Sequence, residues 1–531
     1  MDTVLDKNLI HRVAVGDIPR RSAGRWPDKE ALVEYRGGSR NSLTFDRFNR
    51  ACCSFARGIR GLGLSKGDRV AVICLNSTEF VISMFGLAKG GFVSVPVNPG
   101  LDPRELAYVL NHSESKVLII DDVFVPFLAN HLNKMPNIKH YISIPVSGGQ
   151  ASEPFIDFHE FIKGLDDSEV EDVIIEDRDI VQIMYTSGTT AMPKGVTISN
   201  LNVYFTALQN TIDLQINSKA VITAMMPIFH CAQHALLTTA LVACARIVVI
   251  RGFDPERLMK TIQNEKVTWM FALPMMYRGM LDHPVIDNYD LSSLETCLYA
   301  MTPMDRRTLS DARKRINATF YLATGQTEAY PGTNYFNPDW FSGKEGNVWG
   351  RSLSAYDTAV MDDAGNLLPV GKVGEIVWRG PGVMEGYFKD KEATEQAGKF
   401  GWHHSGDQGY MDEDGMLVFI DRKKDIIKTG GENVPSIRVE TVIMAHPKVE
   451  SAAVIGLPHQ RWIEAVTAVV VPKKDSGLTE EELIQWCKQE LGGFQVPKSI
   501  IFTDNLPRTS TGKIKKHELR KQFNDYYGES K

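Results

Sequence analysis

The stretch YTSGTTAMPKG, residues 185–195, is the most informative part of the chain. It follows an apolar run, 180–184, that predicts a strand. Residues 186–190 are all threonine, serine or glycine, so the backbone can wrap an anion and present several N–H and O–H donors to it. Lys194 adds a mobile cation suited to phosphate.

A polar surface loop is the alternative interpretation of these five residues, but Pro193, Lys194 and Gly195 at this spacing favour phosphate binding. The loop lacks the GK[ST] ending of a P-loop. The candidate nucleotide-binding residues here are Thr186, Ser187, Gly188, Thr189, Thr190 and Lys194.

Short β-branched runs alternate with amphipathic stretches around this loop. The pattern predicts a helix over 77–88 and strands over 69–75, 93–97, 116–120, 220–226, 246–250, 267–272 and 318–322. Strands interleaved with helices are typical of parallel sheets covered on both faces. We therefore expect an α/β fold.

The pattern of predicted secondary structure changes in the last third of the chain. From about residue 350, short runs and turns predict a small β-rich section, and after residue 421 a compact α+β tail has helices near 436–445 and 479–491. The charged segment DRKKD, 421–425, is the predicted boundary. We expect a large N-terminal domain, 1–421, and a small mobile C-terminal domain, 422–531.

Composition excludes several classes of protein. The 531 residues are 43% apolar and 23% charged, which is ordinary for a globular chain and excludes wholesale disorder. Lys+Arg 59 against Asp+Glu 65 gives a net charge of −6 with no polybasic block, so a dedicated nucleic-acid binder is not expected.

Neither a secretion signal nor a disulfide framework is predicted. The first residues lack a cationic start followed by an apolar run. The most apolar stretch, 235–250, is shorter than the about 20 residues of a membrane span, contains Arg246, and predicts a buried helix followed by a buried strand. Seven scattered cysteines without a CxxC pair argue against disulfides or a zinc site and favour a reducing cytoplasm.

The loop resembles the signature of the AMP-forming acyl-activating superfamily, which includes acyl-CoA synthetases, adenylation domains of peptide synthetases and beetle luciferases. Four further segments resemble the family's motifs in the same order, and together they cover about residues 20 to 520. The resemblance implies ATP, Mg²⁺ and CoA as cosubstrates. FGLAKGG, PMMYRGML and MPIFH are also similar to crotonobetaine/carnitine-CoA and fatty-acid ligases.

TGQTE, 324–328, resembles the family's YGxTE segment. The resemblance implies that Thr327 contacts the α-phosphate and that Glu328 holds Mg²⁺, with Ala323 and Thr324 beside the nucleotide. Mg²⁺ commonly takes only one or two carboxylates plus phosphate oxygens, so Glu328 is chemically suitable. A helix-start pattern is the alternative interpretation. Thr324 departs from the family's usual tyrosine.

SGD, 405–407, and DRKKDIIK, 421–428, resemble the ribose and hinge motifs. They imply that Asp407 and Arg422 contact the ribose, that Lys424 is the pivot and that Lys428 approaches the nucleotide in one conformation. A turn carboxylate and a solvated charge run are the alternatives. TGGEN, 429–433, resembles the loop lining the pantetheine tunnel, so Gly430 and Gly431 are candidate CoA contacts.

LPRTSTGK, 506–513, resembles the C-terminal motif whose lysine is catalytic, which implies that role for Lys513. An ordinary surface lysine, like Lys515, Lys516 or Lys521, is the alternative.

Two segments resemble the acid pocket of the family. PIFH, 227–230, implies that His230 gates the acyl channel, with a packed core histidine as the alternative. AMTPM, 300–304, stands where the family usually has GGAP, so Ala300, Met301 and Thr302 should border the acid. Replacing glycines by Ala300 and Met301 narrows this space, which predicts a short- or medium-chain acid.

The reaction implied by the resemblance is acid:CoA ligation. A carboxylate attacks the α-phosphorus of ATP, pyrophosphate leaves, and CoA then displaces AMP. Alternatives are an aryl-acid or carnitine-type CoA ligase, an adenylating enzyme with another acceptor, and a non-catalytic nucleotide-binding regulator. No membrane-spanning segment and no nucleic-acid partner are expected, and a homodimer stays open.

Overall fold

The computed structural model describes residues 3–129, 132–149, 151–186, 192–300, 304, 306–338, 344, 347–509 and 513–528. These residues form two compact units. The first comprises the described parts of 1–188, 192–358 and 378–403, and the second comprises 359–377 and the described parts of 404–531. Each unit has its own core.

The first unit contains two sheets that are mainly parallel. One sheet follows, within the described residues, the order β19 (Gly386–Tyr387), β9 (Lys194–Ser199), β8 (Ile180–Thr186), β4 (Val93–Pro96), β3 (Arg69–Ile73), β5 (Val117–Asp121), β6 (His140–Ile144), β7 (Phe155–Asp157). All neighbours from β8 to β7 are parallel, and only β9 and β19 join antiparallel.

The second sheet of this unit carries the candidate residues Ala300, Ala323 and Thr324 at the ends of its strands. Its order is β2 (Ser39–Thr44), β1 (Glu30–Arg36), β11 (Arg246–Val249), β10 (Val221–Ala224), β12 (Trp269–Phe271), β13 (Thr296–Ala300), β14 (Thr319–Thr324), β15 (Asn334–Phe336), β16 (Val348–Ser352). Strands β1 to β14 in this order run parallel. The α/β prediction is confirmed.

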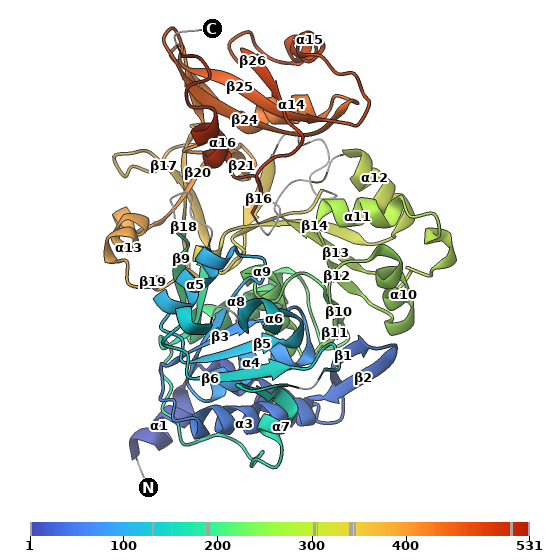
Figure 1. Cartoon of the computed structure of the whole chain (residues 1–531), viewed down its shortest axis with the longest axis vertical. Helices are drawn as coiled ribbons and strands as arrows, with labels where there is room; N and C mark the ends of the chain where they lie inside the picture. The colour runs from blue at the N-terminus through green and yellow to red at the C-terminus, as the bar shows by residue number, and fades with distance from the viewer. Residues whose placement is uncertain are drawn as a thin grey trace. The chain divides into compact units, whose positions relative to one another are not determined.

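Helices cover these sheets. They are α1 (Thr3–His11), α2 (Ile18–Arg25), α3 (Phe45–Gly61), α4 (Thr78–Lys89), α5 (Pro103–His112), α6 (Val125–Ala129), α7 (Phe158–Ile162), α8 (Asn200–Asp213), α9 (Cys231–Val242), α10 (Pro255–Glu265), α11 (Pro274–Leu281), α12 (Arg306–Arg315) and α13 (Lys391–Ala397). Helices α10 to α12 lie along one side of β12–β14 (Figure 1). Residues 235–250 form a buried helix and strand, as predicted.

Local sequence explains where several helices begin. Asp102 accepts hydrogen bonds from the backbone N–H groups of Arg104 and Glu105 at the start of α5, and Pro103 occupies the first turn, where its missing N–H costs nothing. Ser199 and Asn202 form a reciprocal capping box at the start of α8.

The second unit joins a small β-section to an α+β tail. The β-section holds most of β17 (Asp357–Met361), β18 (Gly374–Arg379), β20 (His403–Met411) and β21 (Leu417–Arg422). The tail holds β22 (Ile427–Thr429), β23 (Glu432–Val434), β24 (Val449–His459), β25 (Ile463–Pro472), β26 (Ser499–Phe502), α14 (Ser436–Met444), α15 (Glu480–Glu490) and α16 (Lys516–Gln522). The β-rich section and the tail helices α14 and α15 are as predicted, whereas α16 was not predicted.

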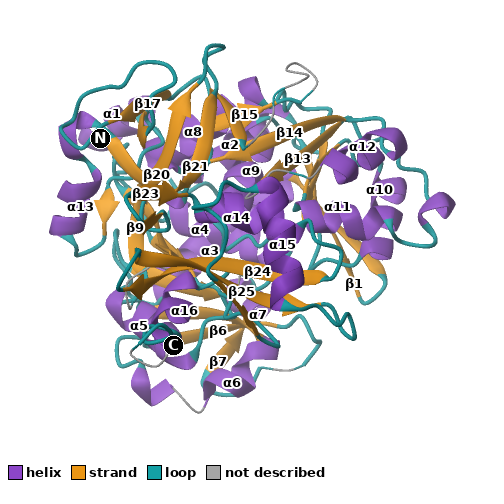
Figure 2. Ribbon diagram, turned by 90° about the horizontal axis from the view of Figure 1, so that it is seen from above, coloured by secondary structure: helices purple, strands orange, loops and turns teal. Residues whose placement is uncertain are grey.

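Alternation along β24 decides which helices cover each face of its sheet. Val454 packs in the cluster formed with α14 and α15, whereas Ala453 and Ile455 pack in the cluster that contains Leu519 of α16. Because successive side chains of a strand point to opposite faces, α14 and α15 cover one face and α16 the other. Figure 2 shows α14 and α15 beside β24 and β25.

Two further findings bear on the early predictions. All seven cysteines are buried and unbonded to one another, in agreement with the absence of a disulfide framework. Among the described residues, none of the helices has both the length and the apolar character needed to cross a membrane.

Candidate functional site

The base of the phosphate-loop candidate is an antiparallel strand pair. Thr186, the last residue of β8, lies opposite Lys194, the first residue of β9. The register brings both ends of the intervening loop together. Ser187, Gly188, Thr189 and Thr190 lie outside the described residues, so their assignments stay predictions.

Lys194 is held near two groups of the segment 386–390. Its Nζ lies 4.9 Å from the ring centroid of Tyr387, within cation–π range. The same amine lies 3.9 Å from the Asp390 carboxylate, and both side chains stay more than a third exposed. An ion pair this exposed is weak, so the amine remains available for an anionic ligand.

Thr327 and Glu328 open a single 3-10 turn, Thr327–Ala329. The Tyr387 hydroxyl donates a hydrogen bond of 3.1 Å to Glu328 Oε1. Thr327 Oγ1 lies 3.3 Å from the buried Cys231 Sγ, and burial raises the pKa of that thiol to about 12. Glu328 and Lys194 therefore both contact Tyr387, which brings two separate motifs to one place.

Ala300 and Ala323 are paired at the carboxyl ends of the parallel strands β13 and β14. In open α/β sheets this edge is where ligands bind. Next to Ala323, Thr324 Oγ1 is buried without a hydrogen-bond partner. Such an orphaned hydroxyl suits a polar ligand atom. Met301 and Thr302 lie outside the described residues.

His230 stands directly before α9 and is half-buried. Its Nδ1 accepts a 3.4 Å hydrogen bond from the Ala232 N–H, and it lies 3.7 Å from Cys231 Sγ. Burial lowers the pKa of His230, so the ring is neutral near pH 7. His230 thus neighbours Thr327 through Cys231.

Asp407 and Arg422 meet across β20 and β21 in the second unit. They are register partners, and Arg422 Nε lies 3.8 Å from Asp407 Oδ1. Burial raises the pKa of Asp407 to about 6, although the cations of Arg422 and Lys513 oppose the shift. A desolvated carboxylate at this position gains from any hydroxyl donor that a ligand brings.

Two lysines share this environment. Desolvation and repulsion by Arg422 lower the pKa of Lys424 to about 8. Desolvation and repulsion by Arg422 and Lys424 likewise lower the pKa of Lys513 to about 8, while the side chain stays more than a third exposed. The structure therefore brings Asp407, Arg422, Lys424 and Lys513 together as one charged cluster.

Two hydrogen bonds join the backbone of Lys513 to Thr509. Thr509 N–H donates to the Lys513 carbonyl at 2.7 Å, and Lys513 N–H donates to Thr509 Oγ1 at 3.1 Å. Arg508 and Ile514 form an isolated β-bridge beside them. These contacts fix the backbone of Lys513 beside that of Thr509.

Gly430 and Gly431 connect β22 and β23 with φ values of 58° and 89°. A two-residue hairpin with both φ values positive is a type I′ turn, which favours glycine. The adjacent Lys428 donates its N–H to Glu464 at 2.7 Å. This hairpin of β22 and β23 does not include the cluster residues Asp407, Arg422, Lys424 and Lys513.

The residues present fit ATP and Mg²⁺. Groups of three or more metal-ligating side chains are lacking within the described ranges, which excludes an all-protein cage there. Glu328 instead offers one carboxylate, the usual arrangement when phosphates and water supply the remaining oxygens. The exposed Lys194 amine and the unpaired Thr324 hydroxyl are groups of the kind that bind phosphate oxygens.

Three contact residues were not anticipated from the sequence: Tyr387, Asp390 and Cys231. Tyr387 ends the short strand β19 and Asp390 follows it. The pairing of this strand with β9 spans about 190 residues of chain, so spacing carried no signal. Cys231 follows His230 directly, and its contact with Thr327 could have been suspected only once that histidine was assigned to the pocket.

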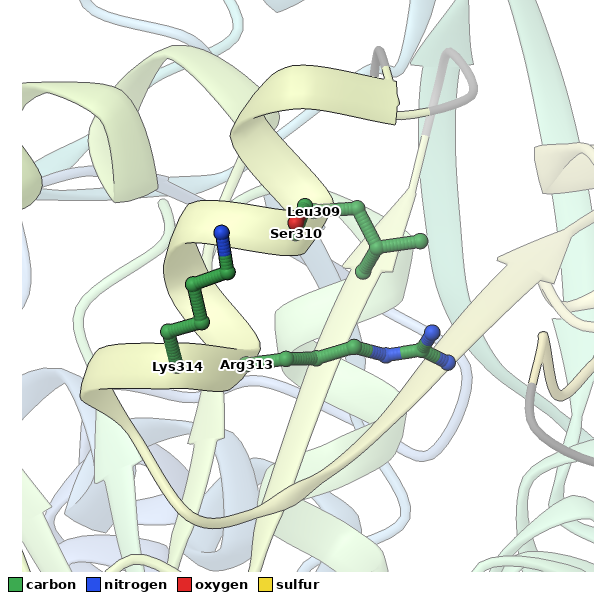
Figure 3. A pocket seen from close by; sticks show the side chains of 4 residues that line it. All are labelled: Leu309, Ser310, Arg313 and Lys314. Atoms are coloured by element: carbon green, nitrogen blue, oxygen red, sulfur yellow. The ribbon is translucent and has the colours of Figure 1, made fainter.

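A surface hollow on α12 is separate from these residues. It is lined by Leu309, Ser310, Arg313 and Lys314, as Figure 3 shows. None of the candidate residues lines it.

These side chains are of the kinds that bind a nucleotide and its metal ion in nucleotide-dependent enzymes. The model of the AMP-binding enzyme family matches residues 19–388, and that of the AMP-binding enzyme C-terminal domain matches 438–513. The chain belongs to the AMP-binding enzyme family. The two matches leave 389–437 between them, so the predicted boundary at residue 421 stays a prediction.

Similar proteins define the class of activity. Feruloyl-CoA synthase of an Amycolatopsis species is 33% identical over 509 residues, 94% of this chain and 99% of the relative. A long-chain-fatty-acid–CoA ligase of Thermus thermophilus is 29% identical over 540 residues, 99% and 98% of the two chains. The structure of o-succinylbenzoate CoA synthetase from Bacillus subtilis with ATP and magnesium aligns with a TM-score of 0.83 at 26% identity, over 96% and 99%.

This chain is an AMP-forming acid:CoA ligase that uses ATP, Mg²⁺ and CoA, as the motifs predicted.

Proposed function

We propose that this ligase activates a short- or medium-chain carboxylic acid. Thr327, Glu328 and Lys513 act as catalytic residues in the proposal, and Lys194, Asp407 and Arg422 bind ATP. The observation that carries the ATP-binding and metal-binding roles is the contact of both Lys194 and Glu328 with Tyr387, because it unites the phosphate loop with the proposed metal ligand.

The first step joins two anions, so charge must be neutralised before the carboxylate approaches phosphorus. Glu328 would hold Mg²⁺, which would supply positive charge to the ATP phosphates. In the proposal Lys194 stabilises the same phosphates, and Lys513 stabilises the negative charge of the reacting carboxylate and α-phosphate. The protein contributes positioning and electrostatics and forms no covalent bond itself.

In the second step the CoA thiol attacks the acyl carbon and AMP leaves. Lys513 would obstruct that approach, so we propose that 422–531 is a mobile domain turning about Lys424. Lys428 approaches the nucleotide in one of the two conformations, and Gly430 and Gly431 line the pantetheine path. Gly431 supports the pantetheine role, because a Cβ at this position would meet no atom within 4 Å and the backbone is open to a thin chain, whereas Gly430 packs against Trp462.

The proposed preference for short- or medium-chain acids is based on Ala300. Its methyl group packs at the core beside Ala323 at a strand end, filling space that glycine would leave open. His230 gates the same channel, and Met301 and Thr302 border it. Relatives acting on ferulate and on long-chain acids make aryl and long-chain substrates the competing outcomes.

The test is pyrophosphate release with a graded panel of aliphatic, aromatic and carnitine-type acids, with and without CoA. We expect the highest kcat/KM for short or medium aliphatic acids, and AMP release only with CoA. Ala300→Gly should move the optimum to longer acids, whereas Ala220→Gly, on the loop before β10, should not. A wild-type optimum at long-chain or aromatic acids contradicts the size proposal, and CoA-independent AMP release contradicts the acceptor.

We also propose that the protein works in the cytoplasm, since all its cysteines are buried as free thiols. A homodimer is the assembly to test, by analytical ultracentrifugation.

A further inference from the structure

Residues 384–388 form a short strap that connects the metal-ligand candidate Glu328 to strand β9, which begins at Lys194. Met384 N–H donates to the Glu328 carbonyl at 2.8 Å, Glu385 N–H donates to the Thr197 carbonyl at 3.0 Å, and Phe388 N–H donates to the Gly195 carbonyl at 2.7 Å. Residues 384–388 are therefore bonded at one end to the Glu328 backbone and at the other to the strand that begins at Lys194.

Tyr387 is the side chain in this strap that contacts both functional groups. Its hydroxyl donates to Glu328 Oε1 at 3.1 Å, and the Lys194 amine lies 4.9 Å from its ring centroid. Its backbone is held too, since it pairs with Val196 and its N–H donates to Thr394 Oγ1 at 2.8 Å. With its backbone fixed on both sides, the half-buried ring has little freedom to leave this position.

We propose that Tyr387 is a positioning residue that orients the Glu328 carboxylate for Mg²⁺ and the Lys194 amine for the ATP phosphates. This inference rests on the proposed function, because it takes Glu328 as the metal ligand. The hydroxyl fixes the orientation of the carboxylate through a single hydrogen bond to Oε1. The ring face stabilises the lysine cation without neutralising it, so its charge stays available for phosphate.

The two contacts can be separated by substitution. Tyr387→Phe removes the hydroxyl and keeps the ring, whereas Tyr387→Leu removes both. We expect Tyr387→Phe to raise the Mn²⁺ dissociation constant of the protein–ATP complex about tenfold, as for a lost hydrogen bond to a charged group, with little change in the KM for ATP. Tyr387→Leu should also raise the KM for ATP about threefold, because the cation–π contact is lost.

The control is Tyr289→Phe. Tyr289 makes the same kind of contact, a 2.8 Å hydrogen bond from its hydroxyl to Glu256, at an exposed site. Mn²⁺ is followed by the electron paramagnetic resonance of the free ion, which needs no acid substrate. Tyr289→Phe should leave the Mn²⁺ dissociation constant unchanged.

The outcomes separate this inference from the proposed function. An unchanged Mn²⁺ dissociation constant in Tyr387→Phe, with or without a lower melting temperature, overturns the positioning role. A wild-type protein that binds Mn²⁺ and ATP but releases no pyrophosphate with any acid overturns the reaction, while the Tyr387 comparison still decides the inference. A wild-type protein that binds no Mn²⁺ with ATP overturns both.

Discussion

Asp407 and Arg422 face each other across two antiparallel strands, with Arg422 Nε 3.8 Å from Asp407 Oδ1. The pair is longer than a direct hydrogen bond, so the carboxylate keeps acceptor capacity despite the adjacent cation. Lys513 joins the same electrostatic cluster, although its motif lies about a hundred residues further along the chain. The ribose candidate and the lysine candidate are thus part of one local arrangement.

Lys513→Ala should reduce adenylate formation about a hundredfold to a thousandfold, because a cation between two anions is lost from the transition state. ATP binding should be mostly retained. Pyrophosphate release and equilibrium ATP binding measure the two effects separately. Lys521→Ala, on α16, is the matched lysine control and should behave as wild type. Near-normal adenylation in Lys513→Ala would remove this residue from its role.

The adenylation rate should fall as pH rises through about 8, the pKa of Lys513. The protonated amine is the active form, so the rate is full below this pKa and decreases about tenfold per unit above it. Lys513→Arg keeps its charge over the whole range, so the alkaline limb should disappear in that variant even if the maximal rate is lower. The same limb in both proteins would assign it to another group.

ATP affinity should fall as pH drops below about 6, the pKa of Asp407. The ionised carboxylate accepts the ribose hydroxyls, and protonation removes that acceptor, so affinity is full above this pKa and is lost below it. The charged groups that act on Asp407 are Arg422, Lys513, Asp421 and Lys424. Calorimetry with ATP measures the profile.

Asp407→Asn provides the control for the phosphates of ATP, which also titrate near this pH. The variant should bind ATP more weakly at pH 7.5, by about tenfold, and should retain only the part of the pH dependence that belongs to the nucleotide. An identical profile in wild type and variant would contradict the assignment.

Gly431→Ala should lower the free energy of unfolding by about 1 kcal/mol, since an L-residue is strained at a φ of 89°. The methyl group would meet no atom within 4 Å, so the cost is conformational rather than steric. Urea denaturation measures it. Gly493→Ala is the control, because its methyl group also meets nothing and its φ lies outside the left-handed region. Equal stability of Gly431→Ala and wild type would contradict the type I′ turn.

Local sequence patterns were sufficient for much of the architecture. The β-branched run at 116–120 became β5, and the stretch at 77–88 became α4. Both elements are buried on all sides, so residue type and the length of the apolar run, rather than a one-sided pattern, indicated them. Linear motifs identified Lys194, Glu328, Asp407 and Lys513 by residue type and order.

Contacts between distant segments depended on the fold. Lys194 and Glu328 are 134 positions apart, and their shared contact arises because β19 adds to the edge of β9 while Met384 bonds to Glu328. The same holds for the pKa values of Asp407 and Lys513, which depend on burial and on the charges that β20, β21 and the final turn bring together. Periodicity and motif order are properties of neighbouring residues, whereas desolvation and charge proximity exist only after long-range strand pairing has excluded water.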